Sequence, residues 1–447
     1  MRIGRQEKFK LIYKKIELTT VFGNGGWDEK LHQTLLLMPG ETENHVVNLH
    51  PEVEYQTWEG FGGAITEATA YNYSLMSETQ RRALTEAYFS PGRMNYQFVR
   101  IPIDSCDFSL GQYTGFERPA RYIVQMLRDA EKVHGAPLSI LLSPWSPPVE
   151  WKSNDTREQG GRLLPEHYDD YAGYLCTYIL WYKGQGFSVR ALTLQNEPHA
   201  VQTWDSCVWT AQEQKVFLRD AMWPALEKHG LTDIEIYVWD HNKERVYEWM
   251  REVVDAETDS MVTGAAVHWY SGDHFENLQL CREQFPDKKL IVSESCFEYR
   301  VYGSVAPSFS AQKLSHELIG DLNSGISAFC DWNLLLDERG GPCYAENYCL
   351  APFLYDTGEK KLKPQFLQQV LELFSGSIIP GSVRIACSRA SEQVEASAWK
   401  RPDGTLALML LNKSGAIAPI CMRVDGMETE LILYPESVSA CVLDGDQ

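Results

Sequence analysis

The chain has 447 residues, 44% of them hydrophobic, so it is long enough to bury one large core and a second, smaller one. Its 61 acidic and 41 basic residues give a formal net charge of -20, which argues against a nucleic-acid partner and an anionic membrane surface. The 11 cysteines form neither a CxxC pair nor a Cys/His cluster, which argues against a disulfide framework and a zinc site.

The first 50 residues are predicted to contribute strands to a small β domain, because residues 8–50 are rich in β-branched residues and alternate with period two. The start, MRIGRQEKFKLIYKKIELTT, carries charges every few residues and has no apolar stretch of signal-peptide length, so we expect a cytoplasmic protein. The glycine-rich segment GNGGWDE at 23–29 lacks the GxGxxG spacing of a dinucleotide site. We also expect no membrane insertion, since no run reaches about 18 apolar residues.

Residues 51–375 are predicted to form the catalytic domain, because short β-rich runs alternate there with longer amphipathic stretches, as in βα units. Helical patterns stand at 77–89, 117–135 and 211–230. Eight units over about 320 residues favour an α/β fold of the (β/α)8 TIM-barrel type over a doubly wound open sheet. The predicted strands are GFGG (60–63), FVRIPI (98–103), SILLS (139–143), ALTLQ (191–195), IEIYV (234–238), AAVHW (265–269), LIVSE (290–294) and ISAFC (326–330).

The C-terminal segment, residues 376–447, returns to a β pattern with little helical periodicity. RPDG at 401–404, between AWK and TLALMLL, predicts a hairpin, because Asp-Gly supplies positive φ where the strands reverse. We therefore expect a side β-sandwich built from both chain termini, residues 1–50 and 376–447.

Two glutamates fall where a TIM barrel carries its catalytic groups, at the C-terminal ends of strands. Glu197 follows the fourth predicted strand in ALTLQNEPHA, and Glu294 closes the seventh in KKLIVSESC. Strands four and seven lie on opposite sides of a barrel mouth, so the two side chains are expected to face each other across a bound sugar. Retaining glycosidic cleavage needs such a pair, one acid that protonates the leaving oxygen and one carboxylate that attacks the anomeric carbon.

The alternative for either residue is a solvated surface charge, which is the usual state of a glutamate. Glu294 follows the apolar run 290–292, where an ionisable group at the strand end needs a reason. In Asn-Glu-Pro, Asn196 is placed to donate a hydrogen bond to a sugar hydroxyl, and Pro198 restricts the chain just after the carboxylate. These positions favour catalysis.

Seven motifs of the barrel segment are similar to those of a known enzyme family. They are EGFGGAITEATA, RIPIDSCDFSLGQYT, LLSPWSPPVEWK, LQNEPHA, VHWY, VSESC and WNLLLDERGGP, in this order. With them the chain resembles glycoside hydrolase family 30, the group that contains the glucosylceramidases. The resemblance spans the whole barrel and implies a barrel with a side sandwich, Glu197 as the acid/base and Glu294 as the nucleophile.

The resemblance also implies a sugar pocket around the two glutamates. Asp107, after the second strand, matches an aspartate that holds hydroxyls of the terminal glucose, although a loop N-cap is its other interpretation. Trp145 and Trp332, at the ends of strands three and eight, match tryptophans of the family, and an indole offers a flat apolar face and one N–H donor.

The same resemblance implies roles for three further residues. Arg100, within the second strand, is expected to hold the nucleophile carboxylate, and Tyr270 is expected to hydrogen-bond it at the edge of the substrate site. Asn347, in the long loop after the eighth strand, resembles an asparagine that reaches the sugar. We expect burial and a neighbouring negative charge to raise the pKa of Glu197, and Arg100 and Tyr270 to lower that of Glu294.

A terminal β-glucoside is the expected substrate, with a β-1,6-glucan, a β-xyloside or a β-fucoside as alternatives within the family. The segment GGPCYAENYCLAPF departs from the family pattern, with Cys343 and Cys349 expected on the leaving-group side. The identity of the aglycone is therefore left open. A non-catalytic carbohydrate-binding protein is the alternative from another class. A serine or metal hydrolase is disfavoured because neither GxSxG nor HExxH occurs, and no metal or organic cofactor is implied, since two carboxylates suffice.

Overall fold

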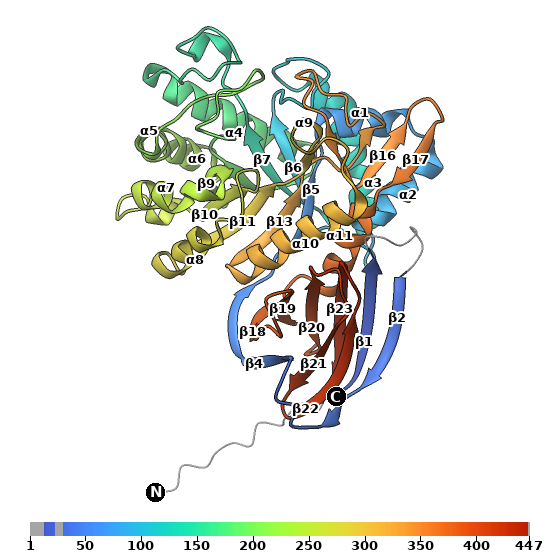
Figure 1. Ribbon diagram of the computed structural model, residues 1–447. Helices are drawn as coiled ribbons and strands as arrows, with labels where there is room; N and C mark the ends of the chain where they lie inside the picture. Colours follow the sequence, from blue (N-terminus) through green and yellow to red (C-terminus); the bar gives the residue numbers. More distant parts are fainter. Residues whose placement is uncertain (1–12, 23–29, 446–447) are drawn as a thin grey trace, which may run out of the picture.

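The computed structural model describes residues 13–22 and 30–445, so GNGGWDE at 23–29 and residues 8–12 of the predicted N-terminal β segment lie outside the described residues. Eight parallel strands close into a barrel in the order β10-β11-β13-β5-β6-β7-β8-β9 (Figure 1). Each of the eight strands predicted from the sequence is present, which confirms the TIM barrel. Their bounds are β5 (Gly60–Ala64), β6 (Phe98–Ile103), β7 (Ser139–Pro144), β8 (Ser188–Thr193), β9 (Glu235–Asn242), β10 (Gly264–His268), β11 (Lys289–Glu294) and β13 (Ile326–Asp331).

Helices surround the barrel, and several of them begin or end at capping residues. Ser77 caps α2 in a reciprocal capping box with Gln80, and Gly135 and Gly230 follow α3 and α6 with φ of 82° and 67°. All three predicted helical segments are confirmed, and the second and third contain a π-helical turn. The helices are α1 (Glu67–Leu75), α2 (Glu78–Phe89), α3 (Val124–His134), α4 (Tyr168–Gly184), α5 (Ala211–Phe217), α6 (Trp223–His229), α7 (Val246–Val253), α8 (Phe275–Gln284), α9 (Tyr299–Tyr302), α10 (Pro307–Asn323) and α11 (Phe366–Ser377).

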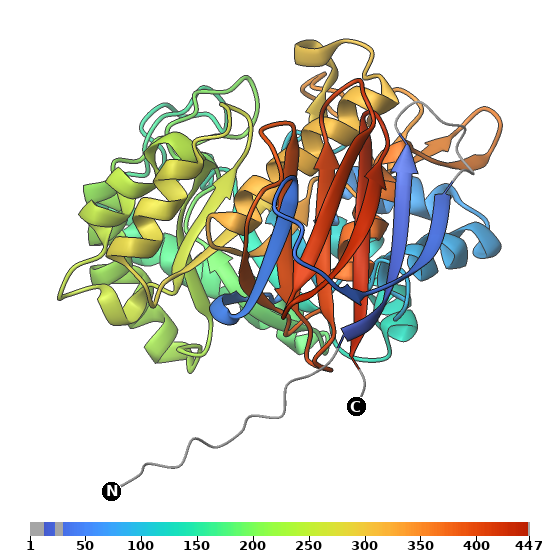
Figure 2. The same cartoon turned by 60° about the horizontal axis from the view of Figure 1, so that its bottom comes forward.

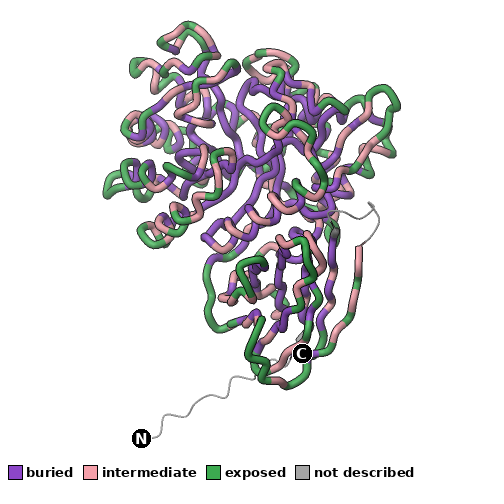
Figure 3. Tube along the Cα trace, in the orientation of Figure 1, coloured by how far each residue is buried: buried purple, intermediate pink, exposed green. Residues whose placement is uncertain are grey.

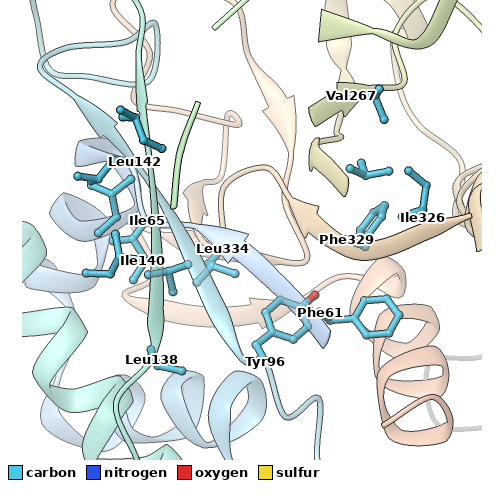
Figure 4. Close-up of a cluster of buried hydrophobic side chains, with 14 of the residues drawn as sticks. Phe61, Ile65, Tyr96, Leu138, Ile140, Leu142, Val267, Ile326, Phe329 and Leu334 are labelled. Atoms are coloured by element: carbon cyan, nitrogen blue, oxygen red, sulfur yellow. The ribbon is translucent and has the colours of Figure 1, made fainter. Parts of the chain in front are cut away.

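The main hydrophobic core lies between the barrel strands and the helices. On β7, Ile140 and Leu142 belong to this outer core, whereas Leu141 belongs to a separate apolar layer inside the barrel. Figure 4 shows part of the outer core, and Figure 3 shows buried strands beneath helices whose outer turns are exposed. The barrel interior is thus a packed core, and only its ends are open to chemistry.

The N-terminal end of the barrel is closed by a ring of four charges. Arg190 lies 2.9 Å from both Glu59 and Glu235, and Lys289 lies 2.6 Å and 2.9 Å from the same two carboxylates. Glu59, Glu235 and Lys289 stand at or before the first residue of their strands, and Arg190 is the third residue of β8. The chemistry-bearing polar residues stand at the opposite, C-terminal end.

The second domain is a ten-stranded sheet in the order β2-β1-β23-β20-β19-β18-β4-β21-β22-β3 (Figure 2). Side chains of β1 and β21, far apart in this order, belong to one core, so the sheet curls into a sandwich. N-terminal strands share the sheet with C-terminal ones, as predicted. The strands are β1 (Tyr13–Phe22), β2 (Lys30–Leu36), β3 (Met38–Pro39), β4 (Val46–Thr57), β18 (Val383–Cys387), β19 (Val394–Lys400), β20 (Leu406–Asn412), β21 (Ala418–Val424), β22 (Met427–Leu433) and β23 (Ser437–Gly445).

The hairpin predicted at RPDG joins β19 to β20. Lys400 pairs with Leu406, and Gly404 has a φ of 86°, the conformation for which glycine is suited. The run LALMLLN of β20 is buried on both faces, since Leu408 belongs to the sandwich core and Met409 to the barrel core. Strand β20 therefore fixes the sandwich against the barrel, beside α10 and α11 (Figure 1).

Two small sheets complete the C-terminal end of the barrel. Strand β12 (Phe297–Glu298) pairs with β15 (Cys349–Leu350), and β14 (Leu336–Asp337) joins β16 (Phe353–Asp356) and β17 (Lys361–Pro364). Among the described helices, none combines the length and the apolar character that a membrane-spanning segment needs. All eleven cysteines lie in the described part and are free thiols. The cytoplasmic location stays a prediction.

Candidate active site

A cavity of about 210 Å³ opens at the C-terminal end of the barrel. It is smaller than the roughly 300 to 1,000 Å³ of pockets that take drug-sized ligands, and side chains from many separate strand ends line it. Eight of the nine residues singled out from the sequence line this cavity: Asp107, Trp145, Asn196, Glu197, Tyr270, Glu294, Trp332 and Asn347. The ninth, Arg100, is fully buried directly beside it.

Arg100, on β6, connects the polar groups beneath the cavity. Its Nη1 donates to Glu294 Oε2 at 2.6 Å, and its Nη2 donates to Asp240 Oδ2 at 2.8 Å and Asn196 Oδ1 at 2.9 Å. Burial lowers the pKa of Arg100, but the charges of Asp240 and Glu294 outweigh it and raise the pKa overall. Arg100 is therefore a buried cation that faces two carboxylates.

Glu294, the last residue of β11, is held at both carboxylate oxygens. Arg100 donates a hydrogen bond to Oε2, and the Tyr270 hydroxyl donates to Oε1 at 2.9 Å. The same hydroxyl lies 3.4 Å from Cys296 Sγ, which lies 3.3 Å from Cys349 Sγ. The orientation of Glu294 is thus fixed by one cation and one hydroxyl donor.

Glu197 follows β8 in a conformation that the fold imposes. Its φ is 47°, a left-handed value that is unusual for a non-glycine residue, and its backbone N–H donates to Asp240 O at 2.9 Å. Its Oε1 lies 3.3 Å from His268 Nδ1, and its Oε2 accepts from Gln202 Nε2 at 3.3 Å. The strained backbone turns this carboxylate into the cavity.

The ionisation of the two glutamates is the reverse of what the sequence led us to expect. Burial raises the pKa of Glu197, but the hydrogen bond to His268 and the charges of His241 and His268 outweigh it and bring the pKa to about 2. Burial raises the pKa of Glu294, against the charges of His268 and Arg100. For Glu197 the expectation was wrong because it left out His268, whose imidazole lies next to the carboxylate. For Glu294 it was wrong because it left out burial, which outweighs the charges of His268 and Arg100.

His268 is the last residue of β10 and is completely buried. Its Nε2 lies 3.1 Å from Asp240 Oδ1, on the side of the ring opposite Glu197. Burial lowers the pKa of His268, but the charge of Glu294 and the hydrogen bonds to Asp240 and Glu197 raise it to about 9. The ring therefore carries a proton between two carboxylates at neutral pH.

Asp240, at the end of β9, fixes the position of His268. It accepts hydrogen bonds from Ser293 Oγ at 2.5 Å and Thr193 Oγ1 at 2.6 Å, in addition to Arg100. Burial raises the pKa of Asp240, but the charge of Arg100 and the hydrogen bond to His268 outweigh it, so the carboxyl is ionised. A buried anion with this many donors is a rigid anchor.

Asp107 and Asn347 form another part of the cavity wall. Burial, together with the charges of Glu294 and Glu197, raises the pKa of Asp107, and a hydrogen bond from Asn347 opposes the rise. Among the described atoms, Asn347 Oδ1 is buried without a hydrogen-bond partner, so it is an acceptor available to a ligand hydroxyl.

The two tryptophans pack on each other. The rings of Trp145 and Trp332 stack with centroids 5.5 Å apart, and the Arg100 guanidinium lies over both rings, at 4.9 Å and 5.4 Å. Only 2% of each tryptophan is exposed. The pair therefore shapes the cavity floor and shields the Arg100–Glu294 ion pair from water.

Several site residues escaped the sequence reasoning. Asp240 and His241 escaped it because the fifth strand was predicted to end at 238, whereas β9 runs to Asn242 with positive φ at Trp239 and Asp240. These two adjacent polar residues, which follow the apolar run 236–239, were the feature of the sequence that could have indicated a site here. Asn242, the last residue of β9, was missed for the same reason. The other unpredicted lining residues come from loops and short elements without periodicity: Gln202, Trp204, Cys296, Glu298 and Arg300. Cys349, expected on the leaving-group side, does line the cavity.

One group of three described side chains has donors suited to a metal ion. The ligand atoms of Glu197, His241 and His268 all lie within 4.8 Å of one another. The sequence reasoning named Glu197 for catalysis alone and found no histidines at ligand spacing, because these residues come from three different strand ends.

Two protein-family models match the chain. The model described as the glycosyl hydrolase family 30 TIM-barrel domain matches residues 58–378, and the model described as the glycosyl hydrolase family 30 beta sandwich domain matches residues 381–439. The chain is 28% identical over 405 residues to the lysosomal acid glucosylceramidase of Mus musculus, covering 84% of this chain and 78% of that protein. It is 26% identical over 217 residues to an endo-1,6-beta-D-glucanase of Neurospora crassa, covering 44% of each.

Solved structures extend the likeness to both domains. SrfJ from Salmonella typhimurium superposes with a TM-score of 0.92 at 30% identity and covers 96% of this chain and 99% of its own. The endo-beta1,6-glucanase BT3312 superposes with a TM-score of 0.88 at 25% identity and covers 97% of this chain and 100% of its own. Barrel, sandwich and their order along the chain are thus shared with proteins of known structure.

Proposed function

This chain belongs to glycosyl hydrolase family 30, and on that premise we propose that it is a retaining β-glycosidase that hydrolyses β-glucosides. One observation carries the proposal: two carboxylates, the partly exposed Glu197 and the buried Glu294, line one small cavity, and Glu294 is held at both oxygens. A double-displacement reaction uses one carboxylate as nucleophile and the other as acid and then base. A non-catalytic sugar-binding protein needs neither group.

Glu294 is the proposed nucleophile. Its Oε1 or Oε2 attacks the anomeric carbon while the bond to the leaving oxygen breaks, giving a covalent glycosyl-enzyme. Arg100 and Tyr270 support this role, because they fix the carboxylate and stabilise its anionic form. Water then attacks the anomeric carbon and releases Glu294 as a carboxylate.

Glu197 is the proposed acid/base, acting together with His268. The proton on His268 Nδ1 passes to Glu197 Oε1 and from there to the leaving oxygen as that oxygen becomes basic. In the second step Glu197, now a carboxylate, takes a proton from the attacking water. Its lowered pKa keeps Glu197 ionised and able to accept a proton in the base step, and His268 supplies the proton for the acid step.

The sugar is proposed to bind between the two glutamates and the wall formed by Asp107 and Asn347. Asp107 accepts hydroxyl hydrogen bonds, and Asn347 Oδ1 offers a buried acceptor without a protein partner among the described atoms. Arg100 holds Asn196 Oδ1, which leaves the amide N–H groups of Asn196 as donors toward a sugar oxygen. The small cavity suits one terminal sugar ring.

A β-1,6-linked glucan is the second candidate substrate. Trp204, Glu298 and Arg300 border the cavity, and the Arg300 guanidinium lies over the Trp204 ring at 5.5 Å. An aromatic ring flanked by charged groups suits a second sugar on the leaving-group side better than a ceramide chain does. The likeness to BT3312, an endo-beta1,6-glucanase, favours the same substrate.

The catalytic roles are tested with two substitutions. Glu294→Gln is expected to lower kcat on a nitrophenyl β-glucoside about 10,000-fold or more, because the nucleophile is lost. Glu197→Ala is expected to slow natural substrates more than a dinitrophenyl glycoside, whose leaving group needs no proton. Glu52→Gln, at an exposed position of β4, serves as the matched control and should match the wild type.

Trapping with a 2-fluoro glycoside and peptide mass spectrometry should place the sugar on Glu294, and a sugar on another residue would reassign the nucleophile. For the substrate, we expect nitrophenyl β-glucoside to react faster than the β-xyloside and β-fucoside. Release of glucose from a β-1,6-glucan, set against release from a glucosyl lipid, separates the two candidate aglycones. Reaction of the α-anomer alone would contradict the proposal.

A further inference from the structure

Three metal-ligating side chains converge beside the proposed acid/base. Glu197 Oε1 lies 3.3 Å from His268 Nδ1 and 3.7 Å from His241 Nδ1. Glu197 and His241 line the cavity, so the point between these atoms is reached from solvent. Among the described atoms, His241 Nδ1 is buried without a hydrogen-bond partner, and it faces the Glu197 carboxylate. An unpaired imidazole nitrogen at this position is a ligand atom that the glycosidase reaction does not use.

The surroundings of His268 resemble those of a metal-bound histidine. Metal-ligating histidines usually give their second ring N–H to a carboxylate, which fixes the tautomer and turns the other nitrogen toward the metal. His268 has this arrangement, with Nε2 at 3.1 Å from Asp240 Oδ1 and Nδ1 toward Glu197. Asp240 is itself fixed by Arg100 and Ser293, so the ring cannot turn without loss of several hydrogen bonds.

We propose that Glu197, His241 and His268 form an inhibitory binding site for a divalent metal ion of the zinc type. Two imidazole nitrogens and one carboxylate oxygen are a donor set that Zn²⁺ takes in tetrahedral sites, with the fourth position open to water or substrate. The ion displaces the proton held between Glu197 and His268, and that proton leaves to solvent. The acid/base of the proposed function is then blocked.

A second group in the cavity has donors that suit the same metal ion. Cys296 and Cys349 bring two sulfur atoms within 3.3 Å of each other, and thiolates also bind Zn²⁺. The two sites differ in their residues, so substitutions separate them. His241→Asn removes a ligand of the histidine site, whereas Cys349→Ser removes a ligand of the thiol pair.

Calorimetric titration of the full chain with Zn²⁺ tests binding without reference to activity. We expect one site in the wild type, an affinity at least about tenfold weaker in His241→Asn, and no change in Cys349→Ser or in the control His50→Ala on the exposed face of β4. Co²⁺ gives a second readout, since its visible absorption in a four-coordinate site should disappear in His241→Asn. Circular dichroism checks that each variant is folded.

Inhibition connects the site to the proposed reaction. Zn²⁺ should inhibit hydrolysis of a nitrophenyl β-glucoside in the wild type, and the inhibition constant should rise in His241→Asn by the same factor as the dissociation constant. Equal Zn²⁺ affinity in the wild type and His241→Asn would overturn the proposal, as would loss of binding in Cys349→Ser alone. If the chain hydrolysed no glycoside, the calorimetry would still decide the metal site, so the two proposals fail separately.

Discussion

One proton is held between Glu197 and His268 at neutral pH, because the pKa of His268 is raised to about 9 while that of Glu197 is lowered to about 2. The proposed reaction needs this proton for the leaving oxygen and needs Glu294 without a proton. We therefore expect kcat/KM to rise with pH as Glu294 ionises, at a pH above the ordinary range of a glutamate, and to fall as the pH passes about 9.

The alkaline fall is assigned to His268 by two comparisons. A dinitrophenyl glycoside needs no acid, so its profile should keep the acid limb and lose the alkaline one. His268→Asn removes the charge that lowers the pKa of Glu197, so Glu197 itself should set the alkaline limb, at a lower pH than in the wild type. An alkaline limb near pH 9 that stays in place in His268→Asn would contradict the role given to this residue.

At the scale of single residues, strand periodicity was enough to find the two glutamates. Glu294 could be predicted because an ionisable group directly after an apolar strand needs a reason, and Asn196 and Glu197 because they follow another. The pairing of His268 with Glu197 could not be predicted, since it joins β10 to the loop after β8, which are far apart in sequence and have β9 between them in the barrel. The direction of the Glu197 pKa depended on that contact and was reversed by it.

At the scale of elements, two short segments meet at the mouth of the cavity. The four-residue helix α9 carries Arg300 over the Trp204 ring, and Glu298 on β12 lies 3.3 Å from the Arg300 guanidinium. Arg300→Ala should lower kcat/KM about threefold on a β-1,6-linked glucose oligomer, which corresponds to a cation–π contact of roughly 0.5 to 1 kcal/mol at an exposed site. The same variant should leave nitrophenyl β-glucoside unaffected.

The ratio of the two kcat/KM values is the quantity to measure. Arg339→Ala, an exposed arginine that lies over the Tyr348 ring, is the matched control and should change neither value. An equal loss on both substrates in Arg300→Ala would show that Arg300 acts on the cavity itself. Neither α9 nor β12 could be predicted from sequence, because two to four residues are too few to carry a period.

At the scale of the whole molecule, the barrel and the sandwich could be predicted because each has a repeated signal. Eight apolar runs at similar spacing gave the barrel, and β-rich runs at both ends gave the sandwich. How the domains pack could not be predicted. The run LALMLLN indicates a strand buried on both faces, but its sequence does not tell which face contacts the barrel core and which the sandwich core. The domain limits at residues 50 and 375 stay a prediction.

The barrel and the sandwich are also joined by a charge cluster. His316 on α10 lies 2.8 Å from Glu395 on β19 and 2.9 Å from Asp273 of the barrel, while Lys413 lies 2.5 Å from Glu395. The hydrogen bond to Glu395 is the largest influence on the pKa of His316 and, against burial and with Asp273, raises it to about 9. The folded protein therefore binds the His316 proton more tightly than the unfolded chain does.

A raised pKa of this kind gives a stabilisation that is complete below the unfolded pKa of about 6.5 and is lost as the pH rises through 9. From pH 6 to pH 10, the His316 contribution, about 2 to 3 kcal/mol once solvent screening of this partly exposed side chain is included, should disappear. His316→Gln should therefore unfold at a lower urea concentration than the wild type at pH 6, and the difference between the two midpoints should close by pH 10. The exposed His50→Gln is the control, with no difference at either pH. A difference that stays constant across this range would mean that His316 joins the domains by packing and not by its charge.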